Sequence, residues 1–246
     1  MEKITVIIIT KNEEKNISEC LKSVSRCGEL IVVDSGSTDD TVKIAKSYTE
    51  KVFYKKWEGY SAQKEYALSL ASNEWVLSLD ADERITEDLM MEISETVKSG
   101  NAGGYFIRRD NYFLNKKITS CGWESDYQLR LFRKSKTSVT DRLVHEGFSV
   151  EGIQSKLKAA MKHYTFSEIS AVMEKINTYS SLEAEQYKNE KKSGGFTIIL
   201  HTISAFLRPY FSQRGYKDGV HGLLISLFNA ISKLLMYAKI WEKSQK

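Results

Sequence analysis

The 246-residue chain is long enough for one large α/β domain, or for one domain with a C-terminal appendage. Its composition, 41% hydrophobic and 28% charged, is that of an ordinary globular protein. Three cysteines without CxxC or Cys/His metal spacing argue against a disulfide framework and favour free thiols in a reducing compartment. The N-terminus runs straight into an apolar segment, so we expect no signal peptide and a cytoplasmic protein.

Positive charge is concentrated toward the C-terminus. Residues 191–246 hold nine lysines and arginines against two acids, a net charge of +7, so residues 1–190 carry −3 of the overall +4. A tail that is both basic and apolar is more typical of a membrane-surface protein than of one that binds nucleic acid. Because the composition shifts near Lys191–Gly195, we predict a main domain over residues 1–190 and a helical tail over 191–246.

The first half of the chain alternates apolar runs with helical patterns. Uncharged apolar runs predict four strands: Ile4–Ile9, Leu30–Val33, Val52–Tyr54 and Trp75–Leu79. Apolar residues at helical spacing predict intervening helices near residues 17–24, 42–48 and 61–71. Strands separated by helices imply right-handed crossovers and a parallel sheet.

The second half is more mixed. Gly104–Arg108 and Gln128–Phe132 are strand-like. The segment Thr165–Glu168 has the pattern of a capping box, which predicts that a helix begins there and continues through Tyr179.

Three carboxylates follow the strand Trp75–Leu79 directly, at Asp80, Asp82 and Glu83. Carboxylates gathered at the end of a buried strand repel one another and lose hydration. Mg²⁺ or Mn²⁺, held by one or two carboxylates and a substrate's phosphates, would remove that cost. The competing interpretation is a solvated acidic turn before a helix. Polar residues at two other strand ends, Thr10 and Asp34, belong to the same predicted sheet edge and favour a ligand crevice with a metal.

The loop Asp34–Thr41 is small and polar and lies between a strand and a helix. Such a loop lets backbone N–H groups approach a ligand, and Asp34 can accept a hydrogen bond from a base or a ribose. The chain has no GxGxxG or GxxxxGK[ST] pattern, which argues against dinucleotide and P-loop sites. An ordinary turn with Asp39 or Asp40 as a helix N-cap is the alternative for the end of the loop.

Three segments in order, Val6–Glu13, Val32–Asp39 and Leu79–Glu83, resemble the motifs of family 2 glycosyltransferases. The resemblance implies the GT-A fold, a Rossmann-like and mostly parallel sheet flanked by helices, here with a helical C-terminal extension. It also implies nucleotide-sugar binding, an inverting mechanism and a divalent metal. More narrowly, later segments are similar to lipopolysaccharide core β-1,4-glucosyltransferases: Asp126–Arg133, Val144–Glu146, His163–Tyr164 and, more weakly, Asp218–Gly222.

The positions of these motifs imply roles for single residues. Four residues would surround the uridine of a UDP-sugar: Thr10, Asn12, Glu13 and Asp34. Lys64 falls near the diphosphate, where the family often has an arginine, and Asp80 faces the ribose or the metal. Asp82 is the principal candidate to bind Mg²⁺ or Mn²⁺, and His145 is a further candidate for the metal or the diphosphate.

Transfer also needs a base that takes the proton of the acceptor hydroxyl. Asp126 resembles the family's acidic motif, in which a leucine follows three residues later, so it is our first choice. Glu124 and Glu146 are the reserves. The alternative for Asp126 is a structural ion pair with Arg130 or Arg133.

Residues 220–241 place apolar side chains at helical spacing. Asn229, Lys233 and Lys239 interrupt the pattern, which argues against a transmembrane span. We expect a basic amphipathic helix on the inner face of the membrane. A helix that covers the sheet or forms a homodimer is the alternative.

We therefore predict an enzyme that transfers a hexose, with glucose as first candidate, from a UDP-sugar to a lipid-linked or polysaccharide acceptor of the cell envelope, such as lipopolysaccharide core. No nucleic-acid partner is expected. Two other functions stay open: a nucleotidylyltransferase of the same α/β crescent and a non-catalytic nucleotide-sugar-binding module. The first usually needs a glycine-rich loop near the N-terminus, and Thr10–Glu14 lacks glycine.

Overall fold

The computed structural model describes residues 3–140, 147–188 and 193–245. The chain divides into two compact units, which we call unit 1 (residues 1–109 and 127–163) and unit 2 (residues 110–126 and 164–246). The sequence-based boundary between residues 190 and 191 lies outside the described residues. The helix that precedes it belongs to unit 2.

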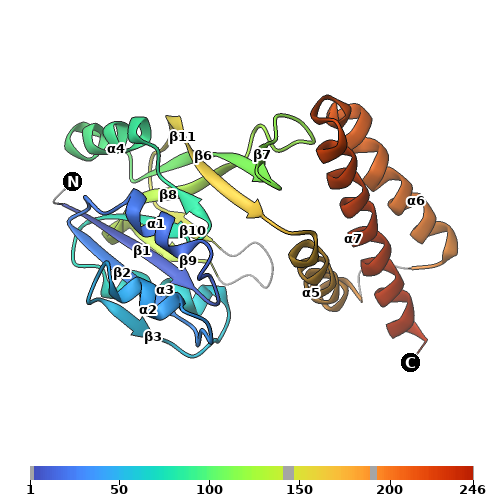
Figure 1. The fold of residues 1–246 in the computed structure, drawn as a ribbon, viewed down its shortest axis with the longest axis horizontal. Coiled ribbons are helices and arrows are strands. Elements are labelled where there is room, and N and C mark those ends of the chain that lie inside the picture. The colour runs from blue at the N-terminus through green and yellow to red at the C-terminus, as the bar shows by residue number, and fades with distance from the viewer. Residues whose placement is uncertain (1–2, 141–146, 189–192, 246) are drawn as a thin grey trace. The chain divides into compact units, whose positions relative to one another are not determined.

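Unit 1 is built on a mixed sheet (Figure 1). The strand order is β3-β2-β1-β4-β8-β6-β11-β5, with β7 paired to β6, and β9 and β10 form a separate pair. The strands are β1 (Ile4–Thr10), β2 (Glu29–Asp34), β3 (Val52–Tyr54), β4 (Trp75–Asp80), β5 (Glu83–Arg84), β6 (Gly104–Phe113), β7 (Lys116–Lys117), β8 (Tyr127–Arg133), β9 (Thr137–Val139), β10 (Phe148–Val150) and β11 (Gln154–Phe166).

The first four strands form the predicted parallel half of the sheet. β2, β1 and β4 pair in parallel, and β3 continues the series beside β2. Their side chains alternate between two buried clusters, so each face of this half is covered. Helices α1 (Ile17–Ser23), α2 (Thr41–Lys46) and α4 (Glu87–Ser99) contribute to one cluster, and α3 (Tyr60–Leu70) contributes to the other.

The remaining half of the sheet is antiparallel. β8 runs antiparallel to both β4 and β6, and β5 pairs antiparallel with β11. No helix connects β6 to β8, so the right-handed crossover that enforces a parallel arrangement is absent there. The prediction of a mostly parallel sheet therefore holds for β1 to β4 only.

The helix after the acidic turn and the helix after β11 begin in different ways. Thr86 caps α4, because its side chain accepts a hydrogen bond from the Leu89 N–H. The capping box at Thr165–Glu168 is wrong: β11 continues to Phe166, and α5 (Ile169–Tyr187) begins after Glu168 without a side-chain cap. The same residue pattern was compatible with the end of a long strand.

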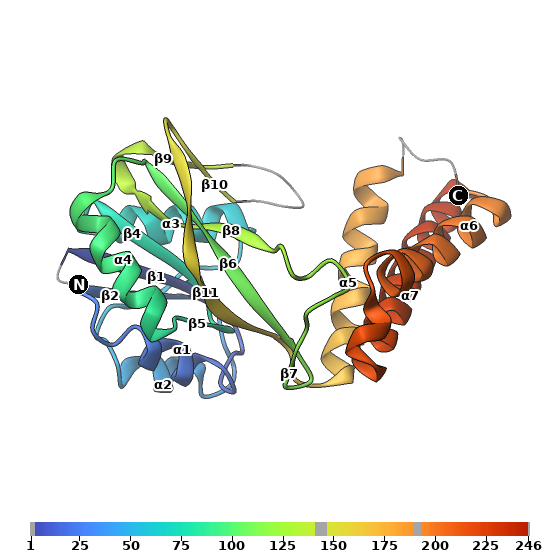
Figure 2. The same ribbon diagram turned by 90° about the horizontal axis from the view of Figure 1, so that it is seen from above.

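Unit 2 contains three long helices among its described residues, α5, α6 (Gly195–Leu207) and α7 (Val220–Ser244) (Figures 1 and 2). α7 packs against both α5 and α6. A π-helical turn (Arg208–Ser212) and a 3₁₀ turn (Gly215–Asp218) connect α6 to α7. Tertiary packing thus accounts for much of the apolar pattern that the sequence shows in this region.

The segment Asp218–Gly222 has a structural explanation. The buried Asp218 carboxylate accepts hydrogen bonds from Thr119 N–H and the Ser120 hydroxyl at 2.9 and 2.6 Å, which fixes the β7 loop. A Cβ atom on Gly222 would lie 1.8 Å from the Gly215 carbonyl oxygen, so no larger residue fits there.

By length and composition alone, one helix among the described residues, α7, could cross a membrane. Core helices of soluble proteins pass the same test, and Ile225, Met236, Tyr237 and Ile240 of α7 are buried. The expectation that this helix does not span a membrane stays a prediction.

A buried carboxylate at the start of β2 joins three segments of unit 1. Glu29 accepts hydrogen bonds from Thr5 Oγ1 at 2.5 Å and from the Ser72 N–H and hydroxyl, both at 2.8 Å. Lys51 Nζ lies 2.5 Å from the same carboxylate. Burial acts to raise the pKa of Glu29, but these donors outweigh burial and lower it to about 2.

We predict that Glu29→Gln lowers the free energy of unfolding at pH 7 by about 2 kcal/mol. Because the folded-state pKa is depressed, the contribution of Glu29 is complete above its unfolded pKa of about 4.5 and declines as pH falls toward 2. Urea denaturation at pH 7 and pH 3 should therefore show a smaller gap between wild type and variant at pH 3. A gap that stays constant or widens would contradict this role.

Candidate active site

Polar residues at three strand ends share one edge of the parallel sheet. Thr10 at the end of β1 pairs in register with Asp34 at the end of β2, and Ile9 pairs with Asp80 at the end of β4. The predicted convergence of these strand ends is what the structure shows. Thr10 Oγ1 is buried and has no hydrogen-bond partner among the described residues.

The loop after β2 folds around the Asp34 carboxylate. Asp34 Oδ2 accepts from the N–H groups of Gly36 and Ser37 at 2.8 and 2.9 Å, and Oδ1 accepts from the Ser37 hydroxyl at 2.5 Å. Gly36 has φ = +98°, a conformation that favours glycine. Asp34 itself is buried, so its first role is to shape this turn.

The loop after β1 is hydrogen-bonded to the same turn. Asn12 adopts φ = +54°; its N–H donates to Ser37 Oγ and its Oδ1 accepts from Thr38 N–H, both at 2.8 Å. The Glu13 N–H donates to Thr41 Oγ1 at 2.7 Å. Two of the residues implied to contact uridine thus also hold the two loops together.

The end of the loop Asp34–Thr41 forms an ordinary turn, which was the alternative to a ligand-binding role for Asp39 and Asp40. Asp39 Oδ1 accepts from Thr41 N–H at 3.0 Å, and its Oδ2 accepts from Glu14 N–H at 3.1 Å. Asp40 occupies the N-cap position of α2 without a side-chain cap.

Glu83 is the centre of a buried network of charges below the strand ends. Its side chain is fully buried, and Oε1 lies 2.6 Å from Arg130 Nη2 and 3.5 Å from Arg109 Nη1. Its other oxygen, Oε2, accepts the Asp80 backbone N–H at 3.0 Å. Burial raises the pKa of Glu83, and the charge of Arg130 opposes that rise. The cluster is therefore not a solvated acidic turn.

Arg130 connects Glu83 to Asp80. The guanidinium is buried and also pairs with Asp80 Oδ2. Burial acts to raise the pKa of Asp80, but the charges of Arg130 and Lys64 outweigh burial and hold that pKa at about 2. Asp80 is thus ionised at neutral pH, and one of its oxygens is already engaged by the protein.

Asp82 lies next to His163, which β11 supplies opposite Glu83. Asp82 Oδ2 is 3.4 Å from His163 Nε2. Asp82 Oδ1 is buried without a hydrogen-bond partner among the described residues. The turn that carries Asp82 is fixed by Arg84 Nη1, which donates to the Ala81 carbonyl at 2.8 Å.

This arrangement fits a hard divalent cation. An oxygen of Asp82 that lacks a partner, beside the ionised Asp80, is a donor set that Mg²⁺ or Mn²⁺ accepts when substrate phosphates complete the coordination. The described residues contain no group of three or more His, Cys, Asp and Glu side chains that could hold a metal without such help.

Lys64 on α3 is half-buried, with Nζ 5.9 Å from the centre of the Phe148 ring. Its positive charge helps to lower the pKa of Asp80. Two of the predicted site residues, His145 and Glu146, lie outside the described residues.

The remaining candidates belong to unit 2. Asn111 Nδ2 donates to Asp126 Oδ2 at 3.1 Å and to the Trp123 carbonyl at 3.3 Å. Glu124, one of the two reserve candidates for the base, is solvent-exposed in the same loop. Arg130, proposed as a structural partner of Asp126, is engaged with Asp80 and Glu83 in unit 1.

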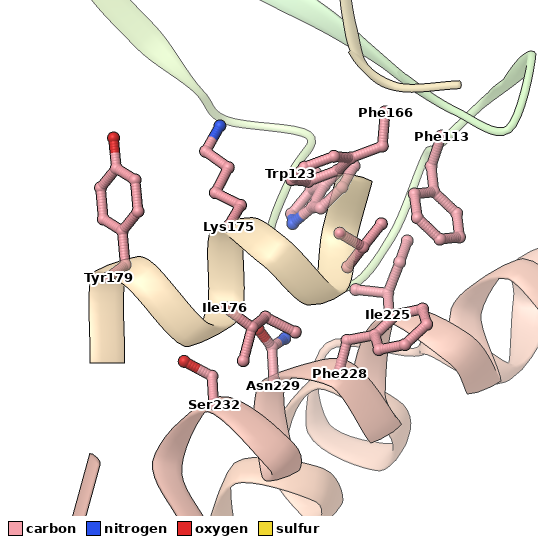
Figure 3. A pocket seen from close by; sticks show the side chains of 11 residues that line it. Phe113, Trp123, Phe166, Lys175, Ile176, Tyr179, Ile225, Phe228, Asn229 and Ser232 are labelled. Carbon is pink, nitrogen blue, oxygen red and sulfur yellow. The ribbon is translucent and has the colours of Figure 1, made fainter. Parts of the chain in front are cut away.

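A cavity of about 150 Å³ lies in unit 2, between α5, α7 and the loop that carries Trp123 (Figure 3). Its walls are mostly aromatic and aliphatic, with Lys175, Asn229 and Ser232 as polar members. Lys175 Nζ lies 4.9 Å from the centre of the Phe166 ring. Asn111 therefore connects Asp126 to the wall of an apolar cavity with a few polar groups, the usual make-up of a small-molecule site.

The family model described as Glycosyl transferase family 2 matches residues 5–150, more than half of the chain. The chain belongs to glycosyl transferase family 2. A glycosyltransferase of Rickettsia typhi, described as uncharacterised, is 34% identical over 100% of this chain and 89% of its own length. Lipopolysaccharide core biosynthesis glycosyltransferase LpsC of Rhizobium meliloti is 30% identical over 98% of this chain and 92% of its own.

The fold of this family 2 glycosyltransferase has a counterpart among solved structures. TarS residues 1–349 of S. aureus, in complex with UDP-GlcNAc, has a TM-score of 0.50 at 15% identity, over 99% of this chain and 91% of that one. At this identity the likeness concerns the fold alone. The predicted family and the GT-A fold are confirmed.

Sequence reasoning missed three members of the site of this glycosyltransferase. Arg130 was weighed only as a partner of Asp126, Arg109 was not considered, and His163 was noted in a motif without a role. All three reach the acids from β6, β8 and β11, whose antiparallel pairing has no short-range signal in the sequence. A run of apolar residues interrupted by a single arginine in β8 was the available clue.

We predict that Arg130→Met lowers the free energy of unfolding of this glycosyltransferase by about 3–5 kcal/mol, because it leaves Glu83 buried without its main partner. Adding Glu83→Gln removes the stranded charge and should restore part of that loss, with a coupling of about 1–3 kcal/mol. Urea denaturation of the two single variants and the double variant measures this coupling.

Arg133→Met is the matched control, since Arg133 lies over the Trp75 ring, 4.5 Å from its centre, and donates to the Gly100 carbonyl. Its effect should be smaller and additive with Glu83→Gln. Simple additivity of Arg130→Met and Glu83→Gln would show that the two side chains are not coupled.

Proposed function

We propose that this glycosyltransferase transfers a hexose, glucose first, from a UDP-sugar to a glycolipid or polysaccharide of the cell envelope such as lipopolysaccharide core, on the cytoplasmic side of the membrane. One observation carries the proposal: Thr10, Asp34 and Asp80 meet at one sheet edge beside Asp82, whose buried oxygen lacks a partner. The acceptor class is supported by the similarity to LpsC, a lipopolysaccharide core biosynthesis glycosyltransferase.

The donor would lie along this edge with its uridine toward β1 and β2. The carboxylate of Asp34, the buried hydroxyl of Thr10 and the loop of Asn12 and Glu13 supply hydrogen-bonding groups there. Lys64, whose charge acts on Asp80, would face the diphosphate. At topological switch points of α/β sheets, nucleotides occupy this position.

Asp82, with Asp80, would hold a Mg²⁺ or Mn²⁺ ion. When bound there, the ion would offset the negative charge that develops on the diphosphate leaving group. Arg130 holds Asp80 ionised and fixed, so this chain positions one of the two carboxylates before any donor arrives.

We predict that UDP-glucose with Mn²⁺ stabilises the enzyme against heat, by about 2.7 kcal/mol at a ligand concentration a hundred times Kd. Asp82→Asn should abolish the Mn²⁺-dependent part of the shift in Tm and leave the metal-free nucleotide part. A thermal-shift panel of nucleotide sugars with and without Mn²⁺ measures both parts.

Asp88→Asn, at an exposed position in the first turn of α4, is the matched control and should behave as wild type. If Mn²⁺ adds nothing to the shift of the wild type, or if Asp82→Asn responds fully, the metal assignment fails.

Product analysis distinguishes a glycosyltransferase from a nucleotidylyltransferase, since UDP release indicates transfer and pyrophosphate indicates nucleotidyl chemistry.

In an inverting transfer the acceptor oxygen attacks the anomeric carbon while the bond from that carbon to the diphosphate oxygen breaks. The electron pair of this bond leaves with UDP, and the acceptor hydroxyl proton passes to a base. We assign the base to Asp126, which Asn111 orients through the contact at 3.1 Å. The acceptor sugar would lie against Trp123, on the wall of the cavity in unit 2 (Figure 3).

We predict that Asp126→Asn lowers kcat by about 10²–10⁴ and leaves the thermal shift with UDP-glucose and Mn²⁺ unchanged. Trp123→Ala should instead raise the KM for the acceptor, with a smaller effect on kcat, because it removes a binding surface rather than the base. Steady-state kinetics with an envelope-derived glycolipid acceptor distinguishes the two effects.

Trp241→Ala is the control for Trp123→Ala, since Trp241 is exposed on α7 and does not line the cavity. Turnover retained by Asp126→Asn would reject the assignment of the base and direct attention to Glu124. An acceptor KM unchanged by Trp123→Ala would remove the cavity from the acceptor site.

A further inference from the structure

Helix α6 presents its apolar face to solvent. Five side chains form this surface, which we call the α6 face: Phe196, Ile199, Leu200, Ile203 and Leu207. Phe196 is 79% exposed and Ile199 is 59% exposed, and no residue of α6 is buried. At 3.6 residues per turn the five side chains fall within an arc of about 100°. A surface helix of a soluble domain normally turns such a stripe inward.

The opposite side of α6 is held by the rest of unit 2. Ile198 packs against the buried cluster that contains Met236 and Tyr237 of α7. The His201 ring stacks on Tyr237 with centres 4.4 Å apart, and Ser193 Oγ donates to the Tyr237 carbonyl at 2.7 Å. The exposure of the α6 face is therefore a fixed feature of how α6 packs on α7.

Exposed positive charge follows the α6 face along the chain. Arg208, Arg214 and Lys217 are exposed, whereas Asp218, the one acid between residues 193 and 219, is buried and bonded to Ser120. The apolar surface also continues beyond α6, since Phe211 is exposed in the following turn. An apolar stripe next to exposed basic side chains is the combination that anionic lipid surfaces attract.

A second copy of the chain matches this surface less well. It would bring the same positive side chains to the contact and no exposed acid from this segment to meet them. Contiguous exposed apolar surface rimmed by polar groups marks an interaction site for a lipid surface or for a second copy alike. The positive charge therefore decides between these two partners.

We propose that the α6 face docks on an anionic lipid bilayer, with α6 lying in the plane of the interface and its five apolar side chains among the upper acyl chains. The sequence-based expectation placed a membrane-surface helix at residues 220–241 of the basic tail 191–246, whereas this proposal assigns the contact to α6 of the same tail. The binding does not depend on the transfer reaction, although a lipid-borne acceptor would explain its use.

The test is flotation of the full-length protein with vesicles of phosphatidylcholine alone or mixed with phosphatidylglycerol. Wild type should float with the mixed vesicles and lose that binding in high salt. Ile199→Glu/Ile203→Glu should reduce the bound fraction by about tenfold or more, because two charges would enter the acyl region. Arg208→Gln/Lys217→Gln should reduce the preference for phosphatidylglycerol.

The matched control is Met91→Glu/Ile153→Glu, which charges two apolar side chains of unit 1 that are 60% and 71% exposed, and it should float as wild type. The thermal shift with UDP-glucose checks folding and donor binding independently of vesicle binding, and it should be equal in all variants. Wild type that stays out of both vesicle fractions, or an α6 variant that floats normally, overturns the proposal. So does a wild-type dimer that Ile199→Glu/Ile203→Glu converts to monomer in sedimentation velocity.

Discussion

The ion pairs of Glu83 determine how the other acids of the site can be arranged. Three carboxylates within four residues of sequence would repel one another, and a fully buried one would be the most costly. Arg130 meets two of them at once, Asp80 and Glu83, and Arg109 meets Glu83 from a neighbouring strand. Burial raises the pKa of Glu83, whereas the charge of Arg130 helps to hold the pKa of Asp80 at about 2. Glu83 thus serves as a structural support, and Asp80 and Asp82 carry the charge that the proposed donor and metal would meet.

In the loops after β1 and β2, residues that are candidates to contact a ligand also hold the loops in place. Asp34 accepts three hydrogen bonds from its own turn, and Asn12 bonds to that turn with both its backbone and its side chain. Residues implied to contact a nucleotide are therefore already ordered by one another. Such preorganisation lowers the conformational entropy that binding must remove, because the loops do not need to fold around the ligand. It also explains why small residues such as Gly36 and Ser37 stand at these positions.

The parallel half of unit 1 could be predicted from the sequence because its signals are local. The runs Ile4–Ile9 and Trp75–Leu79 are apolar on both faces, as strands covered by helices on both sides must be. The antiparallel half could not be predicted in detail, since the pairing of Glu83 with His163 joins residues far apart in sequence. Glu29 illustrates the same limit: an acid at the start of a strand looks solvent-exposed until Ser72 and Lys51 are brought to it. The three partners of the acidic cluster were missed for this reason, whereas the acids themselves were found.

The helical tail shows why composition alone does not identify which apolar surface is exposed. α7 has the longer apolar pattern, yet the burial of Ile225, Met236 and Ile240 against other helices of unit 2 uses much of it. α6 is shorter and more uniformly apolar, so a pattern analysis cannot tell which of its sides is buried. Packing settles the question: contacts of Ile198 and His201 with the α7 side leave Phe196, Ile199 and Ile203 outward. An apolar stripe exposed by the packing of its own helix, beside basic side chains without acidic partners in that segment, is best satisfied by an anionic lipid surface.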